Sequence, residues 1–563
     1  MHSTFGSLNI ANTGINIAQR QIDVTAHNIS NANVEGYSRQ RYINSAFPAM
    51  GWNVQFVPPL RGKEGNGVET LSLDQIRDLF LDRQFRGEQT KATYWETRSG
   101  AMYYIEDVFN SIDSNSLDGV LASFFNALQE LTKNATDEAI RTNVVSEAKR
   151  LIDVFHVYDQ QLTSLMEQQN FMLKEKVKHT NQLLTQMATL NDNIFRFELG
   201  GSVANDLRDK RALILDELSS IMDISYEYVP FEPPMHNIYG IELTQLKVYA
   251  GGNVGEDYEQ NLLVRHFDPY LLKLQRLETG DNEIYDDLVD LDDYEFDPPF
   301  LNVFLTGPGV YDPDNFDLED YDGGDIGERL TEVVGYNNGQ MTGILQSYVD
   351  VRDRNPRDGS TLEKTGIPYY LTELNRMVTC FVNAFNAIHN DGYTMPYEGG
   401  ASVTGVDFFD PDGLRARTIA LSEEILLRSF NIAASSEMVI IESDDEGAAH
   451  SQTGNNEIAL RLIKEIKEGL VEDLDNTIEG FYKNFLGTVA SEASAANGMQ
   501  AAQEVLLHGI HTQRTAVSSV GEDEEMTNMI RFQHAYSAAS RCITTIDEML
   551  DKLINGTGRV GLV

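Results

Sequence analysis

The residues whose types best suit metal binding are the carboxylates of residues 278–328. This stretch contains 18 Asp and Glu residues and no Lys or Arg, and calcium binds carboxylate oxygens. Seven of them could present oxygens to one ion: Asp312, Asp314, Asp317, Glu319, Asp320, Asp322 and Asp325. An EF-hand loop needs a Gly at its sixth position and a Glu at its twelfth, and no frame of this stretch supplies both. Because unpaired carboxylates repel one another, the stretch predicts an exposed acidic segment without a metal site.

His508 and His511 form a second candidate pair, three residues apart in a segment expected to be helical. A zinc protease would carry a Glu directly after the first His, and any zinc site would need further ligands. Neither is evident, so we interpret both as surface histidines. The chain also lacks a G-x-S-x-G motif, a P-loop and a G-x-G-x-x-G motif. The sequence therefore predicts no catalytic site and no cofactor, and the chain is not expected to be an enzyme.

Apolar residues recur at heptad spacing near both ends of the chain, alternately three and four positions apart. We call these two rows the terminal seams. The first contains Leu8, Ala11, Ile15, Ala18, Ile22, Thr25 and Ile29, and the second contains Met529, Phe532, Tyr536, Ala539, Ile543, Ile546, Leu550 and Leu553. This spacing places one narrow apolar stripe on each helix, as in a coiled coil. We therefore expect the termini to pair, the middle of the chain to loop out, and the seams to form an assembly interface.

Residues 28–40 follow directly on the first seam and read Asn-Ile-Ser-Asn-Ala-Asn-Val-Glu-Gly-Tyr-Ser-Arg-Gln. Six of them, which we call the signature residues, are Asn28, Ser30, Asn31, Gly36, Tyr37 and Arg39. The Asn and Ser side chains can satisfy backbone groups where a helix ends, and the glycine tolerates a positive φ. The tyrosine and the arginine are suited to packing against a neighbouring subunit. The segment therefore predicts a helix-ending turn that also forms part of an interface.

Composition limits the classes of partner. At 41% hydrophobic the chain is globular, and its length suggests roughly three or four domains. The formal net charge of −44 disfavours nucleic acid as a partner, because phosphate binding requires clustered Lys and Arg. Residues 1–45 and 526–563 each carry a net charge of +1. Near-neutral ends can pack against copies of themselves while the acidic middle stays solvated.

Targeting and redox signals are sparse. No run approaches the roughly 18 apolar residues that a membrane-spanning helix needs, so no membrane insertion is expected. The amino terminus lacks the basic region and apolar core of a signal peptide. The two cysteines, Cys380 and Cys542, cannot form a disulfide framework, and both lie in apolar helical patterns, which predicts buried thiols.

The periodicity predicts an α+β multidomain fold. We expect helices over residues 3–30, 74–199 with a loop near 111–118, 204–224, 341–390 and 455–518. Residues 42–73 predict an extended arm or a hairpin, and Val, Tyr and Pro make 226–334 a β-rich insertion. Three domains follow: 1–60 with 519–563 as a terminal coiled-coil domain, 61–225 with 335–518 as a mainly helical domain, and 226–334 as an acidic outer domain.

The motifs at both ends resemble those of bacterial flagellar rod, hook and hook-associated axial proteins. The amino-terminal signature is carried by residues 7–11, 14, 28–31 and 36–40, and the carboxy-terminal one by 524–528, 532–533, 536 and 543–550. Three interior stretches narrow the resemblance to proteins of the hook–filament junction: Asn205–Arg211, Asn383–His389 and Gly405–Phe409. Residues 226–334 match nothing we can name.

The resemblance implies a structural protein required for filament assembly, in which a ring of subunits joins the hook to the filament. The implied partners are copies of itself, the hook protein, a second junction protein (hook-associated protein 3), a cytoplasmic export chaperone and the type III export apparatus. It also implies an extracellular location at the junction, reached without a cleaved signal peptide. Paired terminal helices would form the inner tube and the β-rich insertion the outer surface.

Two alternatives remain open at this point. Within the same class, flagellin lacks the Gly36–Gln40 stretch, and hook protein lacks the interior motifs. From a different class, a secreted acidic coiled-coil adhesin or calcium-binding surface protein would use the same acidic insertion to bind a ligand. Gene neighbourhood, or electron microscopy of a deletion strain, separates these readings.

Overall fold

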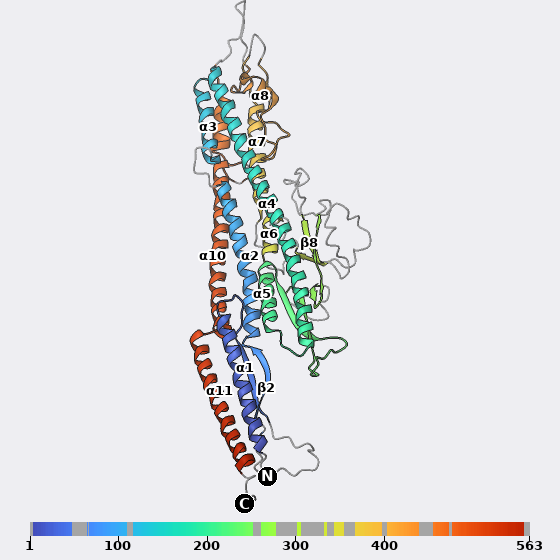
Figure 1. Ribbon diagram of the computed structural model, residues 1–563. Coiled ribbons are helices and arrows are strands. Elements are labelled where there is room, and N and C mark those ends of the chain that lie inside the picture. The colour runs from blue at the N-terminus through green and yellow to red at the C-terminus, as the bar shows by residue number, and fades with distance from the viewer. Residues whose placement is uncertain are drawn as a thin grey trace, which may run out of the picture. The chain divides into compact units, whose positions relative to one another are not determined.

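Figure 1 shows the computed structural model of the chain, which forms two compact units. Unit 1 comprises Met1–Gln89, Gln182–Tyr270 and Val505–Val563, and unit 2 comprises Thr90–Asn181 and Leu271–Glu504. The structure describes residues 4–47, 65, 67–109, 116–251, 261–276, 301–305, 331–334, 343–353, 366–396, 402–438, 454–471, 474 and 476–556. Apart from 301–305, the acidic stretch 278–328 lies outside these residues.

The chain is mostly helical, with three small antiparallel sheets among the described residues. Helices α2 (Leu79–Phe109), α4 (Glu138–Leu199) and α10 (Ile478–Ser518) contribute residues to both units. The region 226–334 is likewise shared, with 226–270 in unit 1 and 271–334 in unit 2.

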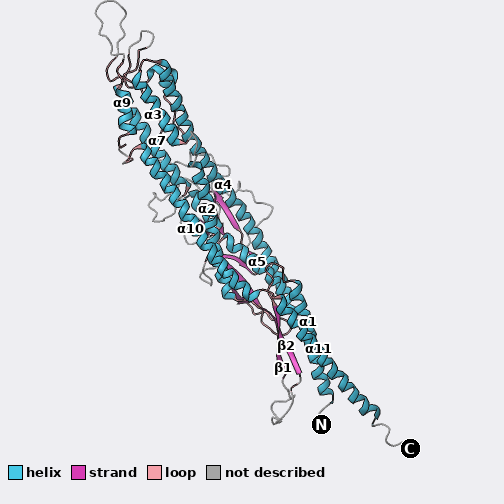
Figure 2. Cartoon of the chain, turned by 90° about the vertical axis from the view of Figure 1, so that its left-hand side faces the viewer, coloured by secondary structure: helices cyan, strands magenta, loops and turns pink. Residues whose placement is uncertain are grey.

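The two terminal helices pair within unit 1. Helix α1 (Thr4–Ser30) lies beside helix α11 (Glu522–Asp551) in both Figure 1 and Figure 2. A short π-helix (Lys552–Gly556) extends α11. A Cβ added to Gly14 would lie 3.8 Å from the Cβ of Ala539, so small residues let the backbones approach. Helix α11 begins after Gly521 and carries four acidic residues in its first turn, where the helix dipole favours negative charge.

The rest of unit 1 includes two antiparallel sheets. Strand β1 (Gln40–Phe47) pairs antiparallel with β2 (Gly67–Gln75), with Gln40 opposite Gln75 and Phe47 opposite Gly67, so the predicted hairpin is confirmed. A second sheet has the order β3-β4-β5-β6. Its strands are β3 (Ile224–Pro230), β4 (Thr244–Ala250), β5 (Leu262–Arg265) and β6 (Asp268–Pro269). Helix α5 (Asn205–Ile221) leads directly into β3.

Unit 2 is a helical unit with one sheet. Its remaining α-helices are α3 (Leu117–Lys133), α6 (Ile344–Asp353), α7 (Ile367–Asn390), α8 (Glu423–Leu427) and α9 (Glu457–Leu462). A short 3-10 helix (Ser429–Asn431) follows α8, and a short π-helix (Ile463–Lys467) follows α9. The sheet has the order β7-β8-β9, from β7 (Leu272–Arg276), β8 (Leu301–Leu305) and β9 (Thr331–Val334). The core contains a cluster of five phenylalanine rings, in which each ring contacts at least three of the others: Phe124, Phe381, Phe385, Phe408 and Phe409.

Local signals explain where several helices begin and end. Ser116 caps α3 by accepting a hydrogen bond from the backbone N–H of Gly119, and Pro368 lies in the first turn of α7, where its missing N–H costs nothing. Helix α4 ends at Leu199. Gly201, just beyond it, has a φ of +78° and donates its N–H to the carbonyl of Glu198. The expected end of this helix at residue 199 is confirmed, and a glycine with positive φ just past the last turn is a common helix stop.

Three expectations were wrong. The helical stretch expected over 74–199 is interrupted near 111–118, as expected, but also at residues 134–137, between α3 and α4. The helix expected over 455–518 is broken between Lys467 and Ile478. A Cβ on Gly469 would lie 2.3 Å from the carbonyl oxygen of Glu465, so the chain turns where only glycine fits. Cys380 is buried as expected, but Cys542 is exposed, because it precedes the seam residue Ile543 and lies off the stripe that faces α1.

The described residues contain no helix long and apolar enough to cross a membrane. Nor do they contain a group of three or more His, Cys, Asp or Glu placed to hold a metal ion. His508 and His511 are both exposed on α10, and the ring of His511 lies 5.8 Å from that of Phe85.

Candidate functional site

The side chain of Asn28 joins three segments at the end of α1. Its Nδ2 donates to the carbonyl of Gln40 at 2.9 Å and to Oε2 of Glu525 at 3.0 Å, and its Oδ1 accepts from the backbone N–H of Gln40 at 3.0 Å. Asn28 is only 1% exposed. The Asn28 amide bonds both the N–H and the carbonyl of Gln40, as a neighbouring β-strand would, at the point where the hairpin begins.

Tyr37 reinforces the same point. Its hydroxyl donates to Oδ1 of Asn28 at 2.8 Å and lies 2.9 Å from Nδ1 of His27. Burial raises the pKa of the Tyr37 hydroxyl above its ordinary value, and the negative charges of Asp206, Asp209 and Glu525 raise it further. The phenol therefore keeps its proton and remains a hydrogen-bond donor.

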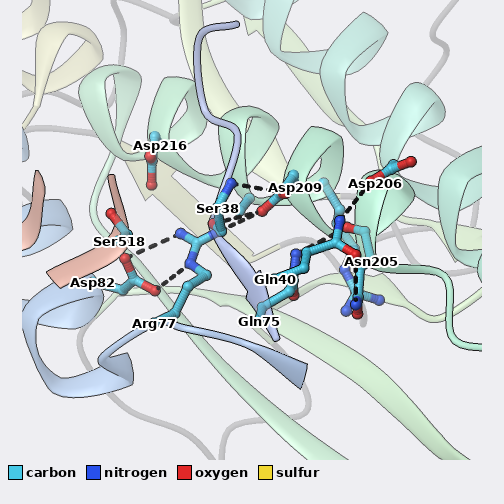
Figure 3. A network of polar contacts seen from close by, with 12 residues as sticks. Ser38, Gln40, Gln75, Arg77, Asp82, Asn205, Asp206, Asp209, Asp216 and Ser518 are labelled. Carbon is cyan, nitrogen blue, oxygen red and sulfur yellow. Dashed lines mark hydrogen bonds and ion pairs between the residues drawn. The ribbon is translucent and has the colours of Figure 1, made fainter. Parts of the chain in front are cut away.

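Ser38 ties the turn to α5, as Figure 3 shows. Oδ2 of Asp209 accepts from the backbone N–H of Ser38 at 3.0 Å, and Oδ1 accepts from its hydroxyl at 2.7 Å. Burial raises the pKa of Asp209 above its ordinary value, because the bonds from Ser38 and the charge of Arg77 offset the burial only in part. Asp209 lies in the interior stretch Asn205–Arg211 that the sequence singled out.

Arg39 connects the turn to the start of α11. Its guanidinium donates to both carboxylate oxygens of Glu524 at 3.1 and 3.0 Å, and NH2 lies 2.8 Å from Oε1 of Glu525. Its backbone N–H donates to the carbonyl of Ser518 at the end of α10. Burial lowers the pKa of Arg39, but the hydrogen bonds and charges of Glu524 and Glu525 outweigh this effect and raise the pKa above its ordinary value. A bidentate ion pair of this kind also fixes the orientation of the guanidinium relative to the carboxylate.

Gln40 completes the contact with α5. Its Nε2 donates to Oδ1 of Asp206 at 2.8 Å, and its Oε1 accepts from Nδ2 of Asn205 at 3.2 Å. Nε2 of Gln75, opposite Gln40 on β2, donates to the carbonyl of Asn205 at 2.9 Å. We call nine of these residues the signature network: Asn28, Tyr37, Ser38, Arg39, Gln40, Asp206, Asp209, Glu524 and Glu525.

A row of buried ion pairs supports the signature network from α2 and α10. Arg77 donates twice to Asp82 and lies 3.3 Å from Asp209. Arg514 bridges Asp82 and Asp216, each at 2.7 Å. In Figure 3, Arg77 lies between Asp82 and Asp209. Because each carboxylate has a cation partner, the row joins α2, α5 and α10 without leaving an unpaired buried charge.

The other signature residues shape the backbone. Gly36 has a φ of +74°, and a Cβ there would lie 2.5 Å from Cγ of Leu213 on α5. Asn31 donates through Nδ2 to the carbonyl of His27, and Ser30 through its hydroxyl to that of Ala26. Both satisfy carbonyls of the last turn of α1, so the helix-ending turn predicted from these residues is present.

The remaining two interior stretches meet each other in unit 2. Oδ1 of Asn386 accepts from the backbone N–H groups of Phe408 and Phe409 at 3.1 and 2.9 Å, and its Nδ2 donates to the carbonyl of Phe409. Asn390 donates to Asp407 at 2.7 Å. The stretches 383–389 and 405–409 therefore form one clamp that holds two core rings in place.

His389 belongs to the same clamp. Its Nδ1 lies 2.6 Å from the carbonyl of Val406, and its Nε2 accepts from the backbone N–H of Ala433 at 2.8 Å. Complete burial lowers its pKa to about 4, and the charge of Arg141 acts in the same direction. One ring nitrogen must donate and the other accept, so only the neutral imidazole fits.

Comparisons with known proteins agree with this geometry. The family model described as the flagellar hook-associated protein FlgK helical domain matches residues 102–233. The flagella basal body rod protein model matches 8–37, and the flagellar basal body rod FlgEFG protein C-terminal model matches 513–556. The flagellar hook-associated protein 1 of Bacillus subtilis (strain 168) is 30% identical over 569 residues, which cover 99% of each chain. This chain belongs to the flagellar hook-associated protein 1 family.

Further members of this family are more distant. The flagellar hook-associated protein 1 of Salmonella typhimurium is 25% identical over 577 residues, covering 97% of this chain and 99% of the relative. A structure described as the flagellar hook junction protein FlgK from Burkholderia pseudomallei covers 77% of this chain and 100% of that chain, with a TM-score of 0.52 at 14% identity. At that identity the likeness shows the fold alone.

Family membership settles the broad role. Proteins of the flagellar hook-associated protein 1 family are structural and are not enzymes, so this chain is a structural component of the flagellar axial assembly. As part of the flagellum it is exported out of the cell. The resemblance that the terminal and interior motifs indicated is confirmed.

In this family member the seam residues are only partly buried. Leu8, Ile15, Ile22, Ile29, Phe532, Ile543, Ile546 and Leu550 are half-buried, while Tyr536 and Leu553 are 39% and 51% exposed. Two helices alone cannot enclose side chains of this size, so much apolar surface on the pair stays in contact with water.

The structure brings four of the six signature residues, Asn28, Gly36, Tyr37 and Arg39, to one place. Sequence reasoning missed the acidic side of this site: Asp206, Asp209, Glu524 and Glu525. Both acidic stretches had been noted as motifs, but nothing in a single sequence showed that they share one partner segment. The Asn28–Gln40 turn, the start of α5 and the start of α11 are far apart in the sequence and meet only in the folded chain.

Proposed function

We propose that this chain is a junction protein that joins the hook to the filament and is required for filament assembly. The observation that supports the proposal best is the half-exposed apolar surface of the α1–α11 pair, because such surface indicates further subunits around it. The interior stretches 205–211, 383–389 and 405–409 point the same way. The structural relative from Burkholderia pseudomallei is itself described as a hook junction protein.

The terminal seams form the assembly interface in this proposal, and copies of the chain close into a ring. The interface residues are Leu8, Ile15, Ile22, Ile29, Phe532, Tyr536, Ile543, Ile546, Leu550 and Leu553. The three-domain division proposed with it is 1–60 with 519–563, 61–225 with 335–518, and 226–334. The first domain lines the inner tube and the last faces outward.

The proposed partners follow from this position. The ring contacts the hook protein on one side and hook-associated protein 3 on the other. Before assembly, a cytoplasmic chaperone delivers the chain to the type III export apparatus, which exports it without cleaving a signal peptide. The signature network fits this role, because it fixes the angle at which α1 and α11 leave the rest of unit 1.

A deletion strain tests the proposal. Electron microscopy should show cells with hooks but no filaments, and flagellin should accumulate as monomer in the medium. Complementation with the wild-type gene should restore filaments. If the deletion strain lacks hooks, the chain belongs to the rod or hook instead, and if filaments remain, the chain is not required for filament assembly.

A further inference from the structure

The loop between β3 and β4 presents an exposed apolar patch in unit 1. Ile238, Tyr239 and Ile241 are 69%, 73% and 63% exposed, Met235 is 39% exposed, and Leu199 at the end of α4 is 42% exposed. We call these five residues the loop patch. Large apolar side chains grouped on one loop, and outside the terminal seams, indicate a site for a partner.

The loop patch is held in one conformation. Oδ1 of Asn237 accepts from the backbone N–H groups of Tyr239 and Ile241, each at 2.9 Å. The N–H of Ile238 donates to the carbonyl of Leu199 at 3.3 Å. A Cβ on Gly201 would lie 2.2 Å from the ring of Tyr239, so the ring packs on bare backbone. These side chains are presented on a preorganised loop, which lowers the entropy lost on binding.

The surroundings of the loop patch are acidic. Residues 231–246, which form the loop and the start of β4, contain two Glu residues and no Lys or Arg. Glu232 and Glu242 flank the loop and are exposed. Two cations on α4 and α5 have carboxylate partners of their own, since Arg196 pairs with Asp192 and Arg208 with Glu198. An occupant of this site should therefore combine apolar side chains with positive charge.

One segment of the chain has this chemistry. Residues 48–64, which join β1 to β2, read Pro-Ala-Met-Gly-Trp-Asn-Val-Gln-Phe-Val-Pro-Pro-Leu-Arg-Gly-Lys-Glu. Seven of these residues are Ala, Met, Trp, Val, Phe or Leu, and Arg61 and Lys63 outnumber the single Glu64. In a chain with a net charge of −44, a positively charged apolar segment is the complement that the loop patch requires.

The strands carry this segment away from the loop patch of the same chain. Gln40 and Gln75, at the base of the hairpin, contact Asn205 close after Leu199. At the other end, Gly67 lies against Thr13 and Ile10 of α1. A strand of eight residues spans roughly 25 Å, so the segment leaves the hairpin at the end remote from the patch. The occupant that we consider is therefore the segment 48–64 of a second copy.

We propose that residues 48–64 of one copy dock on the loop patch of a second copy, with Arg61 and Lys63 facing Glu232 and Glu242. The inference rests on the proposed function, because a contact between copies matters only in an assembly of this chain. Its test is a binding measurement, whereas the junction role is tested by the deletion phenotype, so the two can fail separately.

Fluorescence anisotropy of a labelled synthetic peptide of residues 48–64, titrated with the full-length protein, provides the test. Binding should be saturable, and Ile238→Asp should weaken it about tenfold or more, as expected for an apolar contact at the centre of an interface. Leu427→Asp is the matched control, since Leu427 is 78% exposed in unit 2. The Leu427→Asp protein should bind the peptide as the wild type does. Circular dichroism checks that both variants fold.

A charge exchange makes the test specific. Glu242→Lys should weaken binding of the native peptide and strengthen binding of a peptide carrying Arg61→Glu and Lys63→Glu. Raising the salt concentration should weaken the native pairing, because screening shortens the range of the attraction.

Three outcomes overturn the proposal: no saturable binding, an equal loss with Leu427→Asp, or no effect of Ile238→Asp. A fourth would assign the loop patch to its own chain. If the peptide binds only after residues 48–64 of the protein are replaced by a Gly-Ser linker, the segment docks within one chain and the contact between copies is refuted.

Discussion

At Asn28 a single buried amide satisfies both backbone groups of Gln40 and contacts Glu525 on the opposite end of the chain. An aspartate could not donate and a serine could not reach all three groups, so the residue type follows from the geometry. Tyr37 and Arg39 close the same site from the far side of the turn. The signature residues therefore hold the start of α11 against the end of α1.

Asn28→Ala should lower the free energy of unfolding of unit 1 by about 2–4 kcal/mol, because it leaves the backbone groups of Gln40 buried without partners. Ser30→Ala is the matched control, since the Ser30 hydroxyl is exposed and bonds only within α1; it should change stability by less than about 0.5 kcal/mol. Chemical denaturation measures the change in the free energy of unfolding for both variants. Hydrogen exchange of residues 28–40 in the native protein measures the local effect. Equal effects of the two variants would contradict the role of Asn28.

Gly36→Ala should destabilise the turn by about 2 kcal/mol, because the φ of +74° is unfavourable for alanine and the new methyl group would overlap Leu213. Gly509→Ala is the contrasting case: it lies inside α10 with no atom within 4 Å of the new Cβ, so it should stabilise by up to about 1 kcal/mol. Thermal unfolding distinguishes a loss from a gain. A stabilising Gly36→Ala would show that the turn is not constrained by α5.

At the scale of elements, the pairing of α1 with α11 depends on a stripe of apolar residues that remains half in water. Small residues at Ala11, Gly14 and Ala18 let the helices approach closely, and the larger seam residues cover the sides. Much apolar surface of this pair is therefore left for contact with other subunits, as the proposed function requires. Unit 2, by contrast, has a closed aromatic core around Phe124 and Phe385.

Ile543→Asp should abolish incorporation into the flagellum while changing the melting temperature of the soluble chain little, because the seam is half in water in the single chain and is expected to be enclosed only in the assembly. A carboxylate on the seam would be buried without a partner once subunits assemble, at a cost of several kcal/mol per copy. Cys542→Ser is the control on the exposed neighbouring position. Complementation of the deletion strain, with calorimetry of the purified chains, supplies both readouts. A large drop in melting temperature for Ile543→Asp would mean that the seam already contributes to the stability of the free chain.

At the scale of the whole molecule, each unit contains a buried neutral histidine. Burial lowers the pKa of His389 in unit 2 to about 4, and burial together with the charge of Arg211 lowers the pKa of His266 in unit 1 to about 4. Both values lie below the ordinary 6.5, so the unfolded chain binds protons more readily than the folded chain. The stability that the neutral rings contribute is present above pH 6.5 and is lost as the pH falls toward 4.

His389 alone should account for about 3 kcal/mol of this loss. Denaturation of the wild type and of His389→Gln, compared at several pH values between 7 and 4, measures its share, because the variant lacks the titrating group but keeps all other acid-sensitive groups. The variant should show a shallower decline. Parallel pH profiles for the two proteins would refute the assignment of a depressed pKa to His389.

The sequence by itself determined most of the helices, the hairpin, the terminal pairing and the family, because heptad spacing, helix-stop residues and short motifs are local patterns. It could not show that Asn205–Arg211 and the first turn of α11 both bind the Asn28–Gln40 turn, since the partners are up to 497 positions apart and each reads as an ordinary polar surface. It also placed Cys542 in the interior and continued a helix through Gly469, because periodicity does not show which face a neighbour covers. Only the tertiary structure decided these points, through distances that bring buried donors and acceptors together and that leave one face of each terminal helix in water.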